Sequence, residues 1–102
     1  MPRKPGAGLQ RTEREIAAEK AATLGRAGER LEAALRDVAV ARARFVAVSR
    51  PEERERLAHE YERARQAALV ARRTLLIQRE ALGLRNHRVV DQLYPEPSPL
   101  AR

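Results

Sequence analysis

The stretch "VAVSRPEE", residues 46–53, interrupts a chain that otherwise has the composition of one long helix. Pro51 disfavours helical geometry at the residue before it and suits the first turn of a new helix. Ser49 and Glu52 form a possible capping box for that new helix. The stretch therefore predicts a sharp turn between two helices. The alternative interpretation is a single long helix that is kinked at Pro51.

A regular heptad pattern precedes this turn. Large residues recur every seven positions, and a mostly smaller residue follows each of them by three positions. The large residues are Leu24, Leu31, Val38 and Phe45, and the following residues are Ala27, Ala34, Ala41 and Val48. Such an apolar seam favours close packing against a second helix. The capping box "TERE", residues 12–15, predicts that the first helix begins at Thr12.

A second seam follows the turn, with apolar spacing that alternates between four and three residues. Its members are Leu57, Tyr61, Ala64, Ala68, Ala71, Leu75, Gln78 and Leu82. Folding the chain back at the turn sets Val38 opposite Tyr61 and Leu31 opposite Ala68, so that large residues meet small ones. The two seams predict an all-α fold, an antiparallel helical hairpin over residues 12–83.

The end of the chain departs from this pattern. Gly83 is suited to end the second helix in a left-handed conformation. Asn86 can cap a short amphipathic helix within residues 84–94, and Pro95 stops it. Residues 95–102 contain three prolines and predict an extended, polyproline-like tail with no core to join.

The N-terminal residues 1–11 are basic and contain two prolines and two glycines, which predicts a mobile arm. The whole chain carries a formal net charge of +7. It has no cysteine, which excludes disulfide and thiolate chemistry. No apolar run approaches the ~18 residues of a membrane span, and no apolar targeting segment follows the basic start. We therefore expect a cytoplasmic protein with no membrane association.

Several large apolar residues fall outside both seams. They are Leu69, Val70, Leu76 and Ile77 on the second helix, with Leu35, Val40 and Val46 on the first. An isolated hairpin would leave them in water as a patch that monomeric proteins usually avoid. Self-association into a four-helix bundle, a different protein, or the short third helix could cover them. We expect a homodimer, because the short third helix has too few apolar residues for the whole stripe and a bundle of two hairpins is the commonest closed symmetry for such units.

One edge of the second helix is basic. Arg65, Arg72 and Arg79 lie one heptad apart, roughly 10 Å between neighbours. Together with Arg3, Lys4 and Arg11 they could contact nucleic-acid phosphates. The simpler interpretation is a solvated edge whose arginine stems cover apolar surface.

Candidates for chemistry are few. His59 with Glu55 and Glu62 has helical spacing, but the order of ligands is reversed from the Glu-x-x-His of di-iron bundles, and His59 faces away from the seam. Asn86 and His87 are better explained by capping and docking. We therefore expect no enzyme activity, no metal and no cofactor. Gln78 in the seam either sets the register or marks a hydrated end of the hairpin.

These observations lead us to expect a non-enzymatic scaffold or adaptor that self-associates and binds a protein partner. The predicted contact residues are Leu69, Val70, Leu76, Ile77, Val89, Val90, Leu93 and Tyr94. The last four would form an apolar anchor ahead of the extended tail. A nucleic-acid-binding bundle that uses the arginine edge is the alternative.

Overall fold

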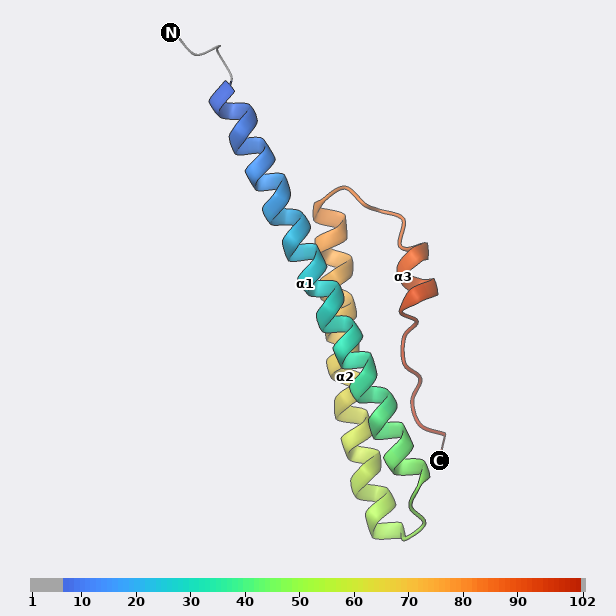
Figure 1. The fold of residues 1–102 in the computed structure, drawn as a ribbon. Coiled ribbons are helices and arrows are strands. Elements are labelled where there is room, and N and C mark those ends of the chain that lie inside the picture. Colours follow the sequence, from blue (N-terminus) through green and yellow to red (C-terminus); the bar gives the residue numbers. More distant parts are fainter. Residues whose placement is uncertain (1–6, 102) are drawn as a thin grey trace.

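The computed structural model describes residues 7–101 as two long antiparallel helices and a short third helix (Figure 1). The helices are α1 (Ala7–Val46), α2 (Pro51–Ala81) and α3 (Arg88–Leu93). α1 and α2 pack against each other, and the described residues contain no strand. The predicted all-α antiparallel hairpin with a short C-terminal helix is confirmed. None of these three helices is long and apolar enough to cross a membrane.

The turn lies at residues 47–50, where it was predicted. Arg50 is extended, with φ −68° and ψ 129°, as expected of a residue that precedes proline. Pro51 is the first residue of α2. The capping box was wrong, because no side chain caps the N-terminus of α2, and Ser49 is exposed.

Arg54 closes the turn in place of a cap. Its Nη1 atom donates to the carbonyl of Val48 at 3.0 Å. Its guanidinium lies 4.1 Å from the centroid of the Phe45 ring. Phe45 in turn packs with Leu57 and Ala58, so this end of the hairpin has its own buried cluster. The turn is therefore held by a cation–π contact above a small apolar core.

α1 begins at Ala7, five residues earlier than predicted. Thr12 lies inside the helix, and its hydroxyl donates to the carbonyl of Gly8 at 3.0 Å instead of capping a first turn. The predicted start was wrong because Ala7, Leu9 and Gln10 are good helix formers and no proline follows Pro5 in this region. Arg11 is therefore helical. Arg3 and Lys4 lie outside the described residues.

The core is a single seam between α1 and α2. The molecule measures 78 × 24 × 15 Å, and its radius of gyration of 20.3 Å far exceeds the ~13 Å of a compact domain of this size. Tyr61 is 0% exposed and packs with Val38, Ala41 and Ala68, which confirms its predicted place opposite Val38. In so thin a rod, most other side chains reach the surface.

The C-terminus of α2 forms a Schellman motif around Gly83. Gly83 has φ +84°, and its N–H donates to the carbonyl of Glu80 at 2.9 Å. The N–H of Leu84 donates to the carbonyl of Arg79 at 2.9 Å. Gly83 therefore ends the helix as predicted.

The end of the chain folds back along the hairpin, and we call residues 86–101 the C-terminal strap (Figure 1). Val90 is buried against Leu31 and Leu75, and Leu100 packs against the clusters around Tyr61 and Phe45. The prediction that the tail has no core to join was therefore wrong. The strap docks through single apolar residues at irregular spacing, so the periodicity of the sequence could not reveal its docking.

Only two of the four residues of the predicted apolar anchor, Val90 and Tyr94, dock on the hairpin. Val90 is buried and Tyr94, just after the helix, packs on the same cluster. Val89 is exposed, and Leu93 is 64% exposed. Val89, Val90 and Leu93 therefore do not share one buried face, and Val90 and Tyr94 are the docking pair at a spacing of four residues.

We expect Gly83→Ala to destabilise the protein by about 1 kcal/mol, because alanine is strained in the left-handed conformation. Gly25→Ala is the matched control and should instead stabilise the protein, since glycine costs roughly 1 kcal/mol relative to alanine inside a helix. A Cβ at either position meets no atom within 4 Å, so only the backbone differs. Urea unfolding of the two variants measures this. Equal shifts in the same direction would contradict the assigned role of Gly83.

Candidate functional site

Four side chains on one flank of α2 hold the C-terminal strap. Tyr61, Arg65, Arg72 and Arg79 are spaced by four, seven and seven residues, which places them along one side of a helix. We call them the donor ladder, because each donates to a backbone carbonyl of the strap. The acceptors are Ser98 for Tyr61, Pro97 for Arg65 at 3.0 Å, Tyr94 for Arg72 at 2.9 Å and Asn86 for Arg79 at 2.9 Å.

Arg72 is the centre of the ladder and is only 7% exposed. Its Nη2 atom pairs with Asp91, and its Nη1 atom lies 3.4 Å from a carboxylate oxygen of Glu96. A buried cation requires such partners, because an unpaired one loses its hydration without compensation. Both carboxylates are themselves exposed and keep contact with water. The strap thus supplies the two carboxylates that pair with Arg72.

The three α2 arginines among the residues predicted to contact nucleic acid are therefore engaged by the strap. Arg65 also pairs with Glu62 at 2.8 Å, and Arg79 donates to Nδ1 of His87 at 3.4 Å. While the strap is docked, Arg72 does not face solvent. The nucleic-acid alternative stays a prediction, and it now requires the strap to leave.

One hydrogen bond ties the strap to α1 directly, and a second links them through Tyr61 of α2. The Tyr94 hydroxyl donates to Glu32. The Tyr61 hydroxyl accepts from Nη2 of Arg42 at 2.7 Å while it donates to the strap. The hydrogen bond to Glu32, burial and the charge of Glu32 all raise the pKa of Tyr94 above its ordinary value of 10.0. The strap therefore bridges both long helices.

The predicted apolar stripe of α2 is divided by the strap. Leu76 packs against the cluster that Val90 joins, and Leu69 is half-buried. Val70 and Ile77 are 55% and 58% exposed. Fold-back of the C-terminal segment therefore covers one part of the stripe and leaves the other in solvent.

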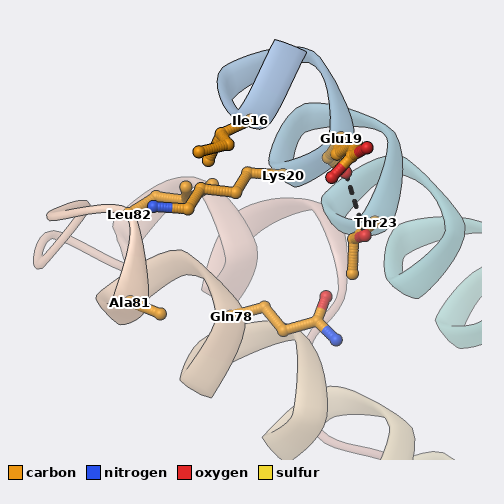
Figure 2. A pocket seen from close by; sticks show the side chains of 7 residues that line it. All are labelled: Ile16, Glu19, Lys20, Thr23, Gln78, Ala81 and Leu82. Carbon is orange, nitrogen blue, oxygen red and sulfur yellow. Dashed lines mark hydrogen bonds between the residues drawn. The ribbon is translucent and has the colours of Figure 1, made fainter. Parts of the chain in front are cut away.

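A second surface lies where α1 extends past the end of α2 (Figure 1). Every residue from Gly8 to Thr23 is exposed, because α2 ends at Ala81 and only its end lies beside this segment. A cleft of about 330 Å³ opens between the two helices at this point (Figure 2). Its lining residues are Ile16, Glu19, Lys20, Thr23, Gln78, Ala81 and Leu82. We call this surface the open end of the hairpin.

The open end combines apolar and unsatisfied polar groups. Ile16 is 45% exposed, and Leu82 is exposed at the opposite wall. Gln78 extends from α2 toward α1, and its buried Oε1 atom has no hydrogen-bond partner (Figure 2). A second groove of about 390 Å³ adjoins Leu82, and both Glu13 and Lys20 line it. Gln78 thus marks the boundary between the packed seam and this surface.

Each histidine lies beside a glutamate, with His59 exposed and His87 half-buried. His59 Nε2 is 3.1 Å from Glu55, and His87 Nε2 is 3.0 Å from Glu80. Among residues 7–101, no group of three or more His, Cys, Asp or Glu side chains is arranged to hold a metal ion. The backbone N–H of Arg88 donates to Oδ1 of Asn86 at 3.0 Å. The N-cap residue of α3 is His87, not Asn86 as predicted, and it makes no side-chain cap hydrogen bond.

Sequence reasoning missed Tyr61 and Glu32 as strap contacts. Tyr61 was assigned only to the seam, although its spacing to the arginines places its hydroxyl on the same flank. Asp91 and Glu96 in a strap otherwise rich in prolines were a signal for a basic partner surface. The contact between Glu32 and Tyr94 joins residues 62 positions apart, and nothing local indicates it.

No protein-family model matches this chain, and neither a curated protein nor a solved structure matches it. A function is therefore argued from two surfaces. One is the surface of the hairpin that the strap covers, which we call the strap groove. The other is the open end.

We expect Arg72→Met to release the strap, since it removes a guanidinium that has three acceptors. Charge-assisted hydrogen bonds each contribute ~1.5–3 kcal/mol, and part of this is regained by hydration of Asp91 and Glu96. Hydrogen exchange at the α3 amides should speed up by about tenfold or more. Arg73→Met, at the exposed neighbouring position, is the control. Equal protection of α3 in both variants would show that Arg72 does not hold the strap.

We expect Glu32→Gln to lower the pKa of Tyr94 toward its ordinary value. The raised pKa means that folding favours the neutral phenol, so its contribution to stability is complete below pH 10 and is lost as the pH rises through the raised value. An NMR titration of the Tyr94 ring measures the change. Glu29→Gln, elsewhere on α1, should leave the Tyr94 titration where it is. An unchanged titration in Glu32→Gln would refute the contact.

Proposed function

We propose that this chain is a non-enzymatic helical adaptor that self-associates into a homodimer through the open end of the hairpin. The observation that carries the proposal is the exposed overhang of α1, where Leu9 and Ile16 are exposed and Ile16 lines one cleft with Leu82 at the end of α2. Clustered exposed apolar residues around a cleft are typical of interaction sites. Burial of each such side chain would contribute on the order of 1.5–3 kcal/mol.

A second copy fits this surface as an antiparallel neighbour. Its α1 overhang would lie along the cleft of the first copy, and the first overhang along the cleft of the second. Two-fold pairing of this kind is the commonest symmetry of homodimers. Where the ends overlap, two α1 helices and two α2 ends form a short four-helix bundle. A donor from the second copy would also satisfy the Oε1 atom of Gln78.

Charge supports the antiparallel arrangement. Glu13 and Lys20 are seven residues apart and line the same groove, with Ile16 between them. Antiparallel pairing centred near Ile16 places Glu13 of each copy close to Lys20 of the other. Parallel pairing would place like charges together. Opposite charges at such flanking positions help to set the orientation of paired helices.

The remaining apolar surface is suited to a protein partner. Val70 and Ile77 on α2, with Val89 and Leu93 on α3, stay exposed when the strap is docked. They are isolated residues rather than the walls of a cleft, which is why we assign self-association to the open end instead. The dimer would then present two copies of this second surface.

We expect the wild-type chain to have a native mass twice that of the 11.5 kDa chain, measured by light scattering on a sizing column. Ile16→Ser with Leu82→Ser should shift the mass to that of one chain, because the variant removes the apolar walls of the cleft. Val70→Ser is the matched control at an exposed apolar position and should leave the dimer intact. A wild-type monomer at all concentrations would contradict the proposal.

The orientation can be tested in the same assay. Glu13→Lys alone should weaken the dimer, since it places two lysines together at both symmetric contacts. Adding Lys20→Glu to the same chain restores opposite charges and should restore the dimer. Failure of the second change to rescue the first would exclude antiparallel pairing centred at Ile16.

A further inference from the structure

The C-terminal strap is held like a bound peptide. Residues 94–101 have no regular secondary structure and run beside the hairpin (Figure 1). Their contacts with α2 include hydrogen bonds from side chains of the donor ladder to the strap backbone, the ion pair of Glu96 with Arg72, and the packed side chains of Tyr94 and Leu100. This is the arrangement by which proteins recognise an extended ligand.

The donor ladder matches the chemistry of a proline-rich chain. Pro95, Pro97 and Pro99 have no N–H group, so this stretch offers many acceptors and few donors. Tyr61, Arg65 and Arg72 contribute the reverse, with a hydroxyl and two guanidinium Nε–H groups aimed at carbonyls. Recognition of the main chain by donors alone does not depend on which side chains the ligand carries.

The other contacts define what else a ligand needs. Arg72 takes two carboxylates, those of Asp91 and Glu96. Apolar side chains enter the seam at both ends of the strap, Val90 at one and Leu100 at the other. A ligand of this groove therefore has a short helical turn that carries one apolar anchor and one carboxylate, as α3 does. An extended, proline-containing stretch with a second carboxylate and a second apolar anchor follows it.

The strap can leave without opening the hairpin. The connection between α2 and α3, residues 82–87, is exposed apart from the half-buried His87. Tyr61 is buried among Val38, Ala41 and Ala68, which belong to the two long helices. Removing the strap therefore exposes the groove while the central contacts of the α1–α2 seam stay in place.

We propose that this groove is a peptide-binding site for an acidic, proline-containing segment of a partner protein that is extended beyond a short helical turn, with the chain's own strap as the resident competitor. A short tether supplies its ligand at an effective concentration on the order of millimolar. The apparent affinity for a segment on another chain then falls by the fraction of molecules whose groove is open. Only a partner that binds more tightly than the strap, or that meets a weakened strap, would occupy the groove.

The test uses the full chain with Ile16→Ser and Leu82→Ser, so that self-association does not interfere. The probe is a fluorescent synthetic peptide with the sequence of residues 86–101, followed by fluorescence anisotropy. Asp91→Asn with Glu96→Gln in the chain removes the acids that hold Arg72 and leaves the groove unchanged. We expect this variant to bind the peptide at least about tenfold more tightly than the parent chain. Adding Arg72→Met should abolish the gain.

Two controls keep the outcome unambiguous. Val90→Asp in the chain should release the strap by removing its apolar anchor. Circular dichroism should show that the helices persist in this variant. A peptide with Asn and Gln in place of its two acids should bind about tenfold more weakly or worse. Equal binding of the two peptides, or binding that survives Arg72→Met, would place the peptide elsewhere and overturn the proposal.

Two further results would also overturn it. One is the absence of peptide binding by both strap-release variants while they remain helical. The other is a dimer formed by exchange of intact straps between chains of the Ile16→Ser and Leu82→Ser background, since this would assign the groove to a second copy. Loss of self-association in the wild type would leave this test unaffected, because the groove and the open end share no residue.

Discussion

The burial of Tyr61 in the seam is the contact on which the rest of the structure depends. Its ring fills the space left by Ala41 and Ala68, which fixes the register of α2 against α1. Because the ring is fully buried, the hydroxyl emerges at one edge of the hairpin, where it accepts from Arg42 and donates to Ser98. The register of the two helices thereby determines where the strap lies.

Arg72 and the strap depend on each other. A guanidinium as buried as this one is costly without partners, and the strap provides Asp91, Glu96 and the carbonyl of Tyr94. Pro95, Pro97 and Pro99 leave the end of the strap with few N–H groups, so its carbonyls need a surface made of donors. Each side supplies what the other lacks, which explains why an arginine-rich edge and a proline-rich end occur in one small protein.

The strap groove and the open end differ in whether the chain covers them. At the strap groove, the chain covers its own apolar and cationic surface. At the open end, α1 continues past Ala81, the last residue of α2, and the α1 residues from Gly8 to Thr23 are exposed. A self-associating adaptor needs one surface that binds a second copy of the chain and another that binds a partner protein. The two proposals rest on these separate surfaces.

Local spacing and turn chemistry determined the hairpin, the turn before Pro51 and the end of α2 at Gly83, because these follow from residues within one or two helical turns of each other. Only the tertiary structure decided the place of the strap. Val90 and Leu100 are single anchors without a period, and the partners of Arg72 are about twenty residues away along the chain. A hydrogen bond from arginine to a carbonyl leaves no pattern in the sequence, since every residue carries that acceptor.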